Sequence, residues 1–195
     1  GKFYLSHMTA RLSALFHIPV SNVPIPHILK GAQYKNSGSY GPIWRVSPIS
    51  VHDHYTLTLD EEKCFPDMVD DNEAVSAPLI DFDDVSHVHQ VVEGTALIDG
   101  YVVLPYDDSP RKVVVFFQLK HCKSAVDDTI EVAEMNRGRE ELSTLMSPQW
   151  PKNVDSLLVY VTNCHVPADN QEKPLPDLCW VSADGFPSHL YSLSS

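Results

Sequence analysis

The chain has 195 residues, which fits one fairly large domain, and its hydrophobic content of 43% is ordinary for a globular protein. No apolar run approaches the roughly 20 residues that a membrane-spanning helix needs, and no secretory signal is recognisable. We therefore expect no membrane segment and an intracellular address, in the cytoplasm or nucleus. The net charge of −12, from 26 acidic and 14 basic residues, argues against a broad basic surface that binds phosphates.

The cysteines give no sign of metal or redox chemistry. None of the four forms a CxxC pair, so neither a zinc ribbon nor a redox motif is indicated. We expect reduced, structural thiols, which suit a reducing compartment. The four are Cys64, Cys122, Cys164 and Cys179.

The first part of the chain predicts one helix and two short strands. Residues 2–17 predict the helix because apolar side chains recur at roughly a 3.6-residue period, and the prolines that follow end it. Residues 43–50 and 54–59 each predict a short strand. Residues 60–84 are acidic and lack a clear period, so we expect an exposed loop or insertion. The apolar stripe of the helix is Phe3, Met8, Leu12 and Phe16.

The middle of the chain carries the clearest strand signals. Residues 95–104 and 113–120 are rich in β-branched and aromatic residues and are joined by a turn, so they predict two strands. Residues 85–93 fit either a strand or a short helix. Residues 125–146 predict a helix, with Ser124 and Asp127 as a capping arrangement before its apolar stripe.

The last part of the chain predicts further strands. Residues 156–163 are almost continuously apolar, which is typical of a central strand covered on both faces. Residues 178–182 predict another strand, and residues 186–193 a last one. The whole order predicts a single α/β domain over residues 1–195, with a mixed central sheet flanked by helices.

The two clearest strands also carry a candidate site. Gln118 and Lys120 lie two residues apart at the end of the second strand, so they share a face while Leu119 points into the core. If the strands pair, Asp99 on the first strand meets them. A carboxylate, an amide carbonyl and an ammonium group at one strand end suit a divalent metal ion and an attacking water, which is the chemistry of phosphodiester cleavage.

This arrangement resembles the PD-(D/E)xK nuclease superfamily. The likeness lies in the order of elements, in the aspartate of the second core strand and in an (E/Q)xK motif on the third, with Gln118 placed 19 residues after Asp99. It covers roughly residues 85–165 and implies a restriction-endonuclease-like α-β-β-β-α-β core. The FQLKH strand end and the LLVYVTN strand are similar to the nuclease-like C-terminal domains of Crinkler-type effectors and transposon-associated proteins.

The resemblance implies a metal-dependent endonuclease-like domain that hydrolyses DNA or RNA, with DNA favoured. Asp99 and Gln118 would hold Mg²⁺ or Mn²⁺, and Lys120 would position the attacking water. Gln118 stands where the family's second acid usually lies, which weakens the expected metal affinity. Glu93, six residues before Asp99, is a further candidate ligand.

The resemblance also implies partners. Lys123, Arg137 and His121 are the candidate contacts to the nucleic-acid substrate. If the likeness to effectors holds, delivery into a host cell is implied.

Other functions stay open on the sequence. The missing second acid and the net charge of −12 favour a catalytically inactive member of the same fold that acts as a protein-interaction or effector module. A third alternative is an acidic adaptor whose residues 60–84 bind a basic partner. The pairs His52/His54 and His87/His89 could each bind zinc with Cys64 or an aspartate, although ten histidines make such pairs expected by chance.

Overall fold

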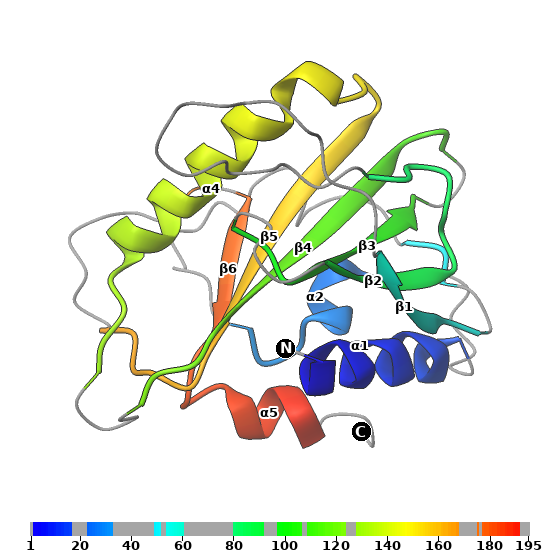
Figure 1. Ribbon diagram of the computed structural model, residues 1–195. Coiled ribbons are helices and arrows are strands. Elements are labelled where there is room, and N and C mark those ends of the chain that lie inside the picture. Colours follow the sequence, from blue (N-terminus) through cyan, green and yellow to red (C-terminus); the bar gives the residue numbers. More distant parts are fainter. Residues whose placement is uncertain are drawn as a thin grey trace.

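The computed structural model shows a six-stranded sheet with helices on both sides (Figure 1). It describes residues 2–16, 23–32, 49–51, 54–60, 80–91, 97–106, 109–123, 128–167, 175 and 177–191. The strands are β1 (Thr56–Asp60), β2 (His87–Val91), β3 (Gly100–Pro105), β4 (Lys112–Lys120), β5 (Val154–Thr162) and β6 (Leu178–Val181). The helices are α1 (Lys2–Leu15), α2 (Ile25–Ile28), α4 (Val132–Met146) and α5 (Phe186–Tyr191), with a 3-10 turn η1 (Ser147–Gln149).

The sheet is mixed, as the sequence predicts. Its strands lie in the order β1-β2-β3-β4-β5-β6. The strands β2, β3 and β4 form an antiparallel meander, whereas β4, β5 and β6 run parallel, and β1 runs parallel to β2. A parallel pair needs a crossover connection, which α4 supplies between β4 and β5. The α/β fold class, with helices flanking a mixed sheet, is therefore confirmed.

Alternation along the strands separates two hydrophobic cores. Along β4, Val115 and Phe117 pack under α1 and α2, while Val114 and Phe116 pack under α4. We call these two sides of the sheet the α1 face and the α4 face. Figure 1 shows α1 and α4 on opposite sides of the sheet. The strand β5 contributes to both cores, which confirms the prediction of a central strand covered on both faces.

The helix predicted for residues 2–17 is present as α1, but its apolar stripe is wrong at both ends. Phe3 is 78% exposed and Phe16 is 47% exposed. Leu5, Met8 and Leu12 form the centre of the buried side of α1. They are spaced three and four residues apart, as the helical period requires, and neither phenylalanine lies on this side.

Two C-terminal predictions also change. The helix predicted for residues 125–146 begins at Val132, because Thr129 forms a β-bridge with His165 and the N–H of Ile130 donates to the carbonyl of His165 (3.0 Å). The strand predicted for residues 186–193 is wrong, since the chain forms the helix α5 there.

Several remaining predictions can be placed. Residues 85–93 contain a strand, β2, and not a helix. Most of the acidic segment (61–79), most of the strand predicted for residues 43–50, the cap at Ser124 and Asp127, and Glu93 lie outside the described residues. No helix within the described ranges is long and apolar enough to cross a membrane.

The expectation of reduced thiols is wrong for two cysteines, because Cys122 and Cys164 form a disulfide. Lys120 and Thr162 are register partners on the parallel strands β4 and β5, and each cysteine follows its strand by two residues. Strand pairing thus brings the two Cα atoms to 5.9 Å. The N–H of Cys122 donates to Asn163 (2.7 Å) and the Asn163 amide donates back to the carbonyl of Cys122 (3.0 Å). Cys179 is free and buried.

Candidate functional site

Asp99 lies one residue before β3, at a point where strand pairing shifts by one residue. The register pairs Gly100 with Phe117, yet the N–H of Asp99 also reaches the carbonyl of Phe117 (2.8 Å). This is the hydrogen-bond pattern of a β-bulge, a feature that re-aims side chains and is frequent beside functional sites. The Asp99 carboxylate turns to β4, where its Oδ2 accepts the N–H of Leu119 (2.7 Å).

Gly100 allows the backbone of β3 to pass close to β2 and to α1 at this point. A Cβ at position 100 would lie 2.5 Å from the carbonyl oxygen of His89 and 2.8 Å from the Leu5 side chain on α1. Because a backbone oxygen cannot yield as a side chain can, any other residue at position 100 would move the start of β3. The position of Asp99 therefore depends on this glycine.

The Asp99 carboxylate lies close to the plane of the sheet. Backbone N–H groups of a strand point within that plane, and the N–H that binds Asp99 belongs to Leu119, between Gln118 and Lys120. Burial raises the pKa of Asp99, and the hydrogen bond from Leu119 counteracts part of this rise. The end of β4 thus holds a partly desolvated carboxylate that a nearby cation would stabilise in its charged form.

Gln118 projects from β4 towards α4. Its Oε1 lies 3.4 Å from the position that a Cβ on Gly138 would occupy. This oxygen is buried and has no hydrogen-bond partner among the described residues. Buried polar atoms are normally hydrogen-bonded, so an orphaned amide oxygen one residue along β4 from the N–H that binds the Asp99 carboxylate is suited to accept a cation. A hard divalent cation with oxygen ligands fits this requirement.

Lys120 and two residues that the sequence did not indicate complete this end of the strand. The Nζ of Lys120 lies 3.8 Å from Oε1 of Glu134 in the first turn of α4. Tyr160 is the register partner of Gln118 on β5. Burial raises the pKa of Tyr160 to about 12, and the charges of Glu134 and Asp99 act in the same direction. We call these five residues (Asp99, Gln118, Lys120, Glu134 and Tyr160) the β4-end cluster.

The remaining predicted site residues lie elsewhere or beyond the described chain. His121 and Lys123 are exposed just after β4, where they adjoin the cluster. Arg137 is exposed on the side of α4 opposite its buried stripe, which does not bring it towards Asp99. Glu93 cannot be placed, because residues 92–96 lie outside the described ranges.

Glu134 and Tyr160 carried weak sequence signals. Glu134 precedes Gly138 by four residues, so the two share a helix face, but that face could be matched to β4 only after the start of α4 was known. Tyr160 lies within an apolar strand, where an aromatic residue predicts core packing. Its place opposite Gln118 follows from the strand register alone.

Comparisons with known proteins add no relative to this description. No family model matches the chain, and neither a curated protein nor a solved structure matches it. No relative therefore assigns a chemistry to the β4-end cluster.

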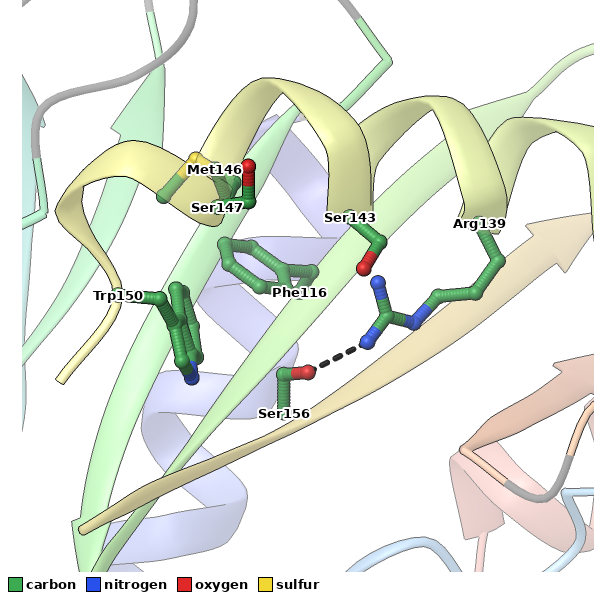
Figure 2. Close-up of a pocket in the computed structure, with 7 residues that line it drawn as sticks. All are labelled: Phe116, Arg139, Ser143, Met146, Ser147, Trp150 and Ser156. Carbon is green, nitrogen blue, oxygen red and sulfur yellow. Dashed lines mark hydrogen bonds between the residues drawn. The ribbon is translucent and has the colours of Figure 1, made fainter. Parts of the chain in front are cut away.

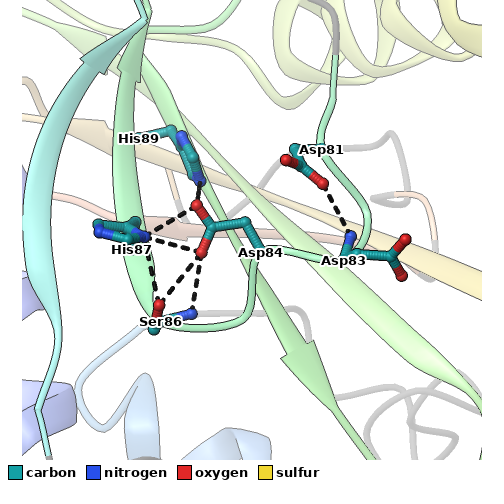
Figure 3. Close-up of polar contacts among 6 residues, drawn as sticks. All are labelled: Asp81, Asp83, Asp84, Ser86, His87 and His89. Carbon is teal, nitrogen blue, oxygen red and sulfur yellow. Dashed lines mark hydrogen bonds and ion pairs between the residues drawn. The ribbon is translucent and has the colours of Figure 1, made fainter.

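A second polar group involves the histidines of β2 (Figure 3). Asp84 lies between them, with Nδ1 of His87 2.8 Å from both carboxylate oxygens and Nε2 of His89 3.2 Å from Oδ2. Burial raises the pKa of Asp84, but hydrogen bonds from His87 and the N–H of Ser86 outweigh it and hold the pKa below its usual value. In the described part of the chain, no three His, Cys, Asp or Glu side chains are arranged to hold a metal ion.

The same group superficially resembles a serine–histidine–aspartate relay. The hydroxyl of Ser86 is 3.2 Å from Nδ1 of His87, but this is the nitrogen that already faces Asp84. A relay needs one ring nitrogen for the nucleophile and the other for the acid, so the geometry does not activate Ser86. His89 stacks on Tyr101 at 4.4 Å between ring centroids, which indicates a packing role.

A pocket of about 220 Å³ opens between the C-terminal half of α4 and the sheet (Figure 2). Arg139 is its charged wall, and its Nη2 lies 2.5 Å from both Ser156 Oγ and Asp177 Oδ2. Asp177 balances the charge of the buried guanidinium, so Arg139 joins α4 to β5 and the start of β6. The other lining residues are Phe116, Ser143, Met146, Ser147 and Trp150.

Proposed function

We propose that the chain is a metal-dependent endonuclease-like domain that hydrolyses phosphodiester bonds of DNA or RNA at the β4-end cluster. The observation that carries the proposal is the orphaned, buried Oε1 of Gln118 at the strand end where Leu119 fixes the Asp99 carboxylate. These two oxygens would hold Mg²⁺ or Mn²⁺, since both are hard ligands of the kind that these cations prefer.

Each residue then has a separate task. A bound divalent ion lowers the pKa of a coordinated water and offsets negative charge on the reacting phosphate. Asp99 and Gln118 would hold that ion, and the ammonium group of Lys120 would orient the water and balance charge that develops on the phosphate oxygens. His121 and Lys123, exposed just beyond β4, would contact neighbouring phosphates.

The order of elements supports the proposal. The succession α1, β2, β3, β4, α4, β5 is compatible with the α-β-β-β-α-β order that the sequence resemblance implies, with α2 and β1 added between α1 and β2. Asp99 precedes the second strand of that series, and Gln118 and Lys120 end the third.

The test is cleavage of labelled duplex DNA, single-stranded DNA and RNA with Mg²⁺ or Mn²⁺. We expect the unmodified chain to cut at least one substrate, and Asp99→Asn and Lys120→Ala to lose at least about 100-fold in rate, the scale of one catalytic group. Lys152→Ala, which removes an exposed lysine in the turn before β5, is the matched control and should cut normally.

Two results would overturn this function. One is the absence of metal-dependent cutting on all three substrates, and the other is cutting that survives both Asp99→Asn and Lys120→Ala. Melting temperatures of the variants within about 3 °C of the unmodified chain, a shift of roughly 1 kcal/mol for this size, would show that they are folded.

A second candidate function is a non-catalytic interaction module with the same fold. The net charge of −12, the amide at Gln118 and the pairing of Lys120 with Glu134 favour it. It predicts no cleavage, together with binding to a basic protein partner that weakens as salt is raised.

A further inference from the structure

Gln118 leaves the proposed metal site one carboxylate short, and Glu134 is placed to supply it. The strand β4 and the helix α4 approach each other at two successive pairs of residues. Gly138 stands against the Gln118 oxygen, and Glu134, one helical turn earlier, meets Lys120, two residues further along the strand. The helix therefore brings a carboxylate to the same strand end as the Gln118 amide.

The absence of a side chain at Gly138 bears on this approach. A Cβ at that position would meet the Gln118 oxygen at 3.4 Å, the edge of ordinary contact. Glycine costs stability inside a helix, so a glycine facing an orphaned oxygen leaves space where a larger residue would cover it. The glycine therefore leaves the Gln118 oxygen without a side chain from position 138 packed against it.

Asp99 and Glu134 both contact the last residues of β4, Asp99 at the N–H of Leu119 and Glu134 at the side chain of Lys120. The two acids come from different elements, Glu134 from the first turn of α4 and Asp99 from the residue before β3. The Asp99 carboxylate binds the backbone N–H of Leu119, which points within the plane of the sheet. The Gln118 amide, the Asp99 carboxylate and the Glu134 carboxylate thus lie at three consecutive residues of β4, Gln118, Leu119 and Lys120.

We propose that Glu134 is the second carboxylate ligand of this site and exchanges Lys120 for the metal ion when the ion binds. The inference rests on the proposed function, because it assigns a ligand to the same metal. The exchange is easy, since the side chains of Lys120 and Glu134 are 53% and 50% exposed and an exposed ion pair is weak. It also releases the Lys120 ammonium group for the attacking water.

The test is isothermal titration of Mn²⁺ into the unmodified chain and four variants, without nucleic acid. We expect Glu134→Gln to weaken Mn²⁺ binding at least about 10-fold, because charged ligands set the affinity of such sites. Glu140→Gln removes the same charge from an exposed position on another side of α4, and should change affinity less than about twofold under the salt screening of a surface charge.

The decisive variant moves the charge instead of removing it. Gln118→Glu combined with Glu134→Gln puts the carboxylate back on the strand, and should return Mn²⁺ affinity to within about threefold of the unmodified chain if charge count governs binding. The fourth variant, Asp99→Asn, should abolish binding and serves to identify the site.

The outcomes separate the two proposals. If Mn²⁺ binds and Asp99→Asn abolishes binding, but Glu134→Gln binds as tightly as the unmodified chain, the metal site stands and the role of Glu134 is overturned. If the unmodified chain binds no Mn²⁺, both the metal site and the role of Glu134 are overturned. A double variant that binds no better than Glu134→Gln would also contradict the charge relocation.

Discussion

Two buried polar groups, one on each face of the sheet, differ in how their hydrogen-bonding atoms are used. On the α1 face, the Arg11 guanidinium donates to the carbonyls of His189 and His27. The His189 ring bonds through both nitrogens, to the Tyr4 hydroxyl (2.9 Å) and the carbonyl of Lys30 (2.9 Å). On the α4 face, the Gln118 oxygen is buried with no partner in the described part of the chain.

This difference separates a structural network from a candidate site. The side chains of Arg11 and His189 are 2% and 0% exposed and join α1, α2 and α5, so their bonds hold helices together. His7 is an exception on this side, with a buried Nε2 that lacks a partner among the described residues. At the end of β4, by contrast, Lys120 and Glu134 are half-exposed and the Gln118 oxygen has no partner within the described ranges, a combination typical of ligand-binding sites.

The largest stability effect should come from the disulfide at the end of β4 and β5. It closes a loop of 42 residues, so the loop-entropy relation gives about 4 kcal/mol for its loss in Cys122→Ser. Urea unfolding of this variant and of the reduced protein measures the effect. Cys179→Ser, at the free buried cysteine, is the comparison and should respond equally with and without reductant. An unchanged midpoint under reducing conditions would contradict the disulfide.

The next largest effect should show that the α1-face network is structural. Arg11→Met keeps much of the apolar stem but removes the hydrogen bonds to the carbonyls of His189 and His27, which should destabilise the fold by about 3 kcal/mol. Arg137→Met, at an exposed position on α4, is the matched control and should change stability by less than about 0.5 kcal/mol. Equal effects in the two variants would break the comparison between the faces.

The α1-face network also makes stability depend on pH. Burial and then the Arg11 charge lower the pKa of His189 to about 4, from 6.5 in the unfolded chain. Between those values the unfolded state binds a proton that the folded state does not, so stability falls as the pH drops from 6.5 to 4 and this group has no effect above 6.5. The shifted pKa of His189 should lower the free energy of unfolding by about 2 kcal/mol between pH 7 and pH 5. His189→Gln, measured by urea unfolding at both pH values, should lose that part of the difference.

The smallest effect on stability should come from the α4 face, where a substitution should stabilise the fold slightly or leave it unchanged. Gln118→Met replaces an orphaned amide with an apolar group of similar length, so it should leave stability unchanged or raise it by up to about 1 kcal/mol. Metal binding should be lost in the same variant. A loss of more than about 1 kcal/mol would mean that the Gln118 oxygen has a structural partner.

The sequence predicted those elements whose signal is local. The strand β4 and the apolar strand β5 appear where β-branched residues run together, and α1 appears where the helical period is clear. The start of α4 was missed because the residues before it pair with the segment after β5, a contact distant in sequence. The disulfide was missed for the same reason, since it depends on the register of β4 against β5.

The same difference between local signals and contacts distant in sequence applies to the candidate site. Gln118 and Lys120 could be paired from their spacing on one strand. The bulge at Asp99 could not, because it arises from a mismatch between β3 and β4, nor could the meeting of Glu134 with Lys120 across α4.

The most direct test of the account is diffraction from crystals grown with Mn²⁺, whose anomalous signal locates the ion. The account predicts a peak about 2.1 Å from an Asp99 carboxylate oxygen and from Oε1 of Gln118, the distance expected for small hard cations. A Mn²⁺ peak found only elsewhere, such as between Asp84 and His87, or no peak at the end of β4, would contradict it.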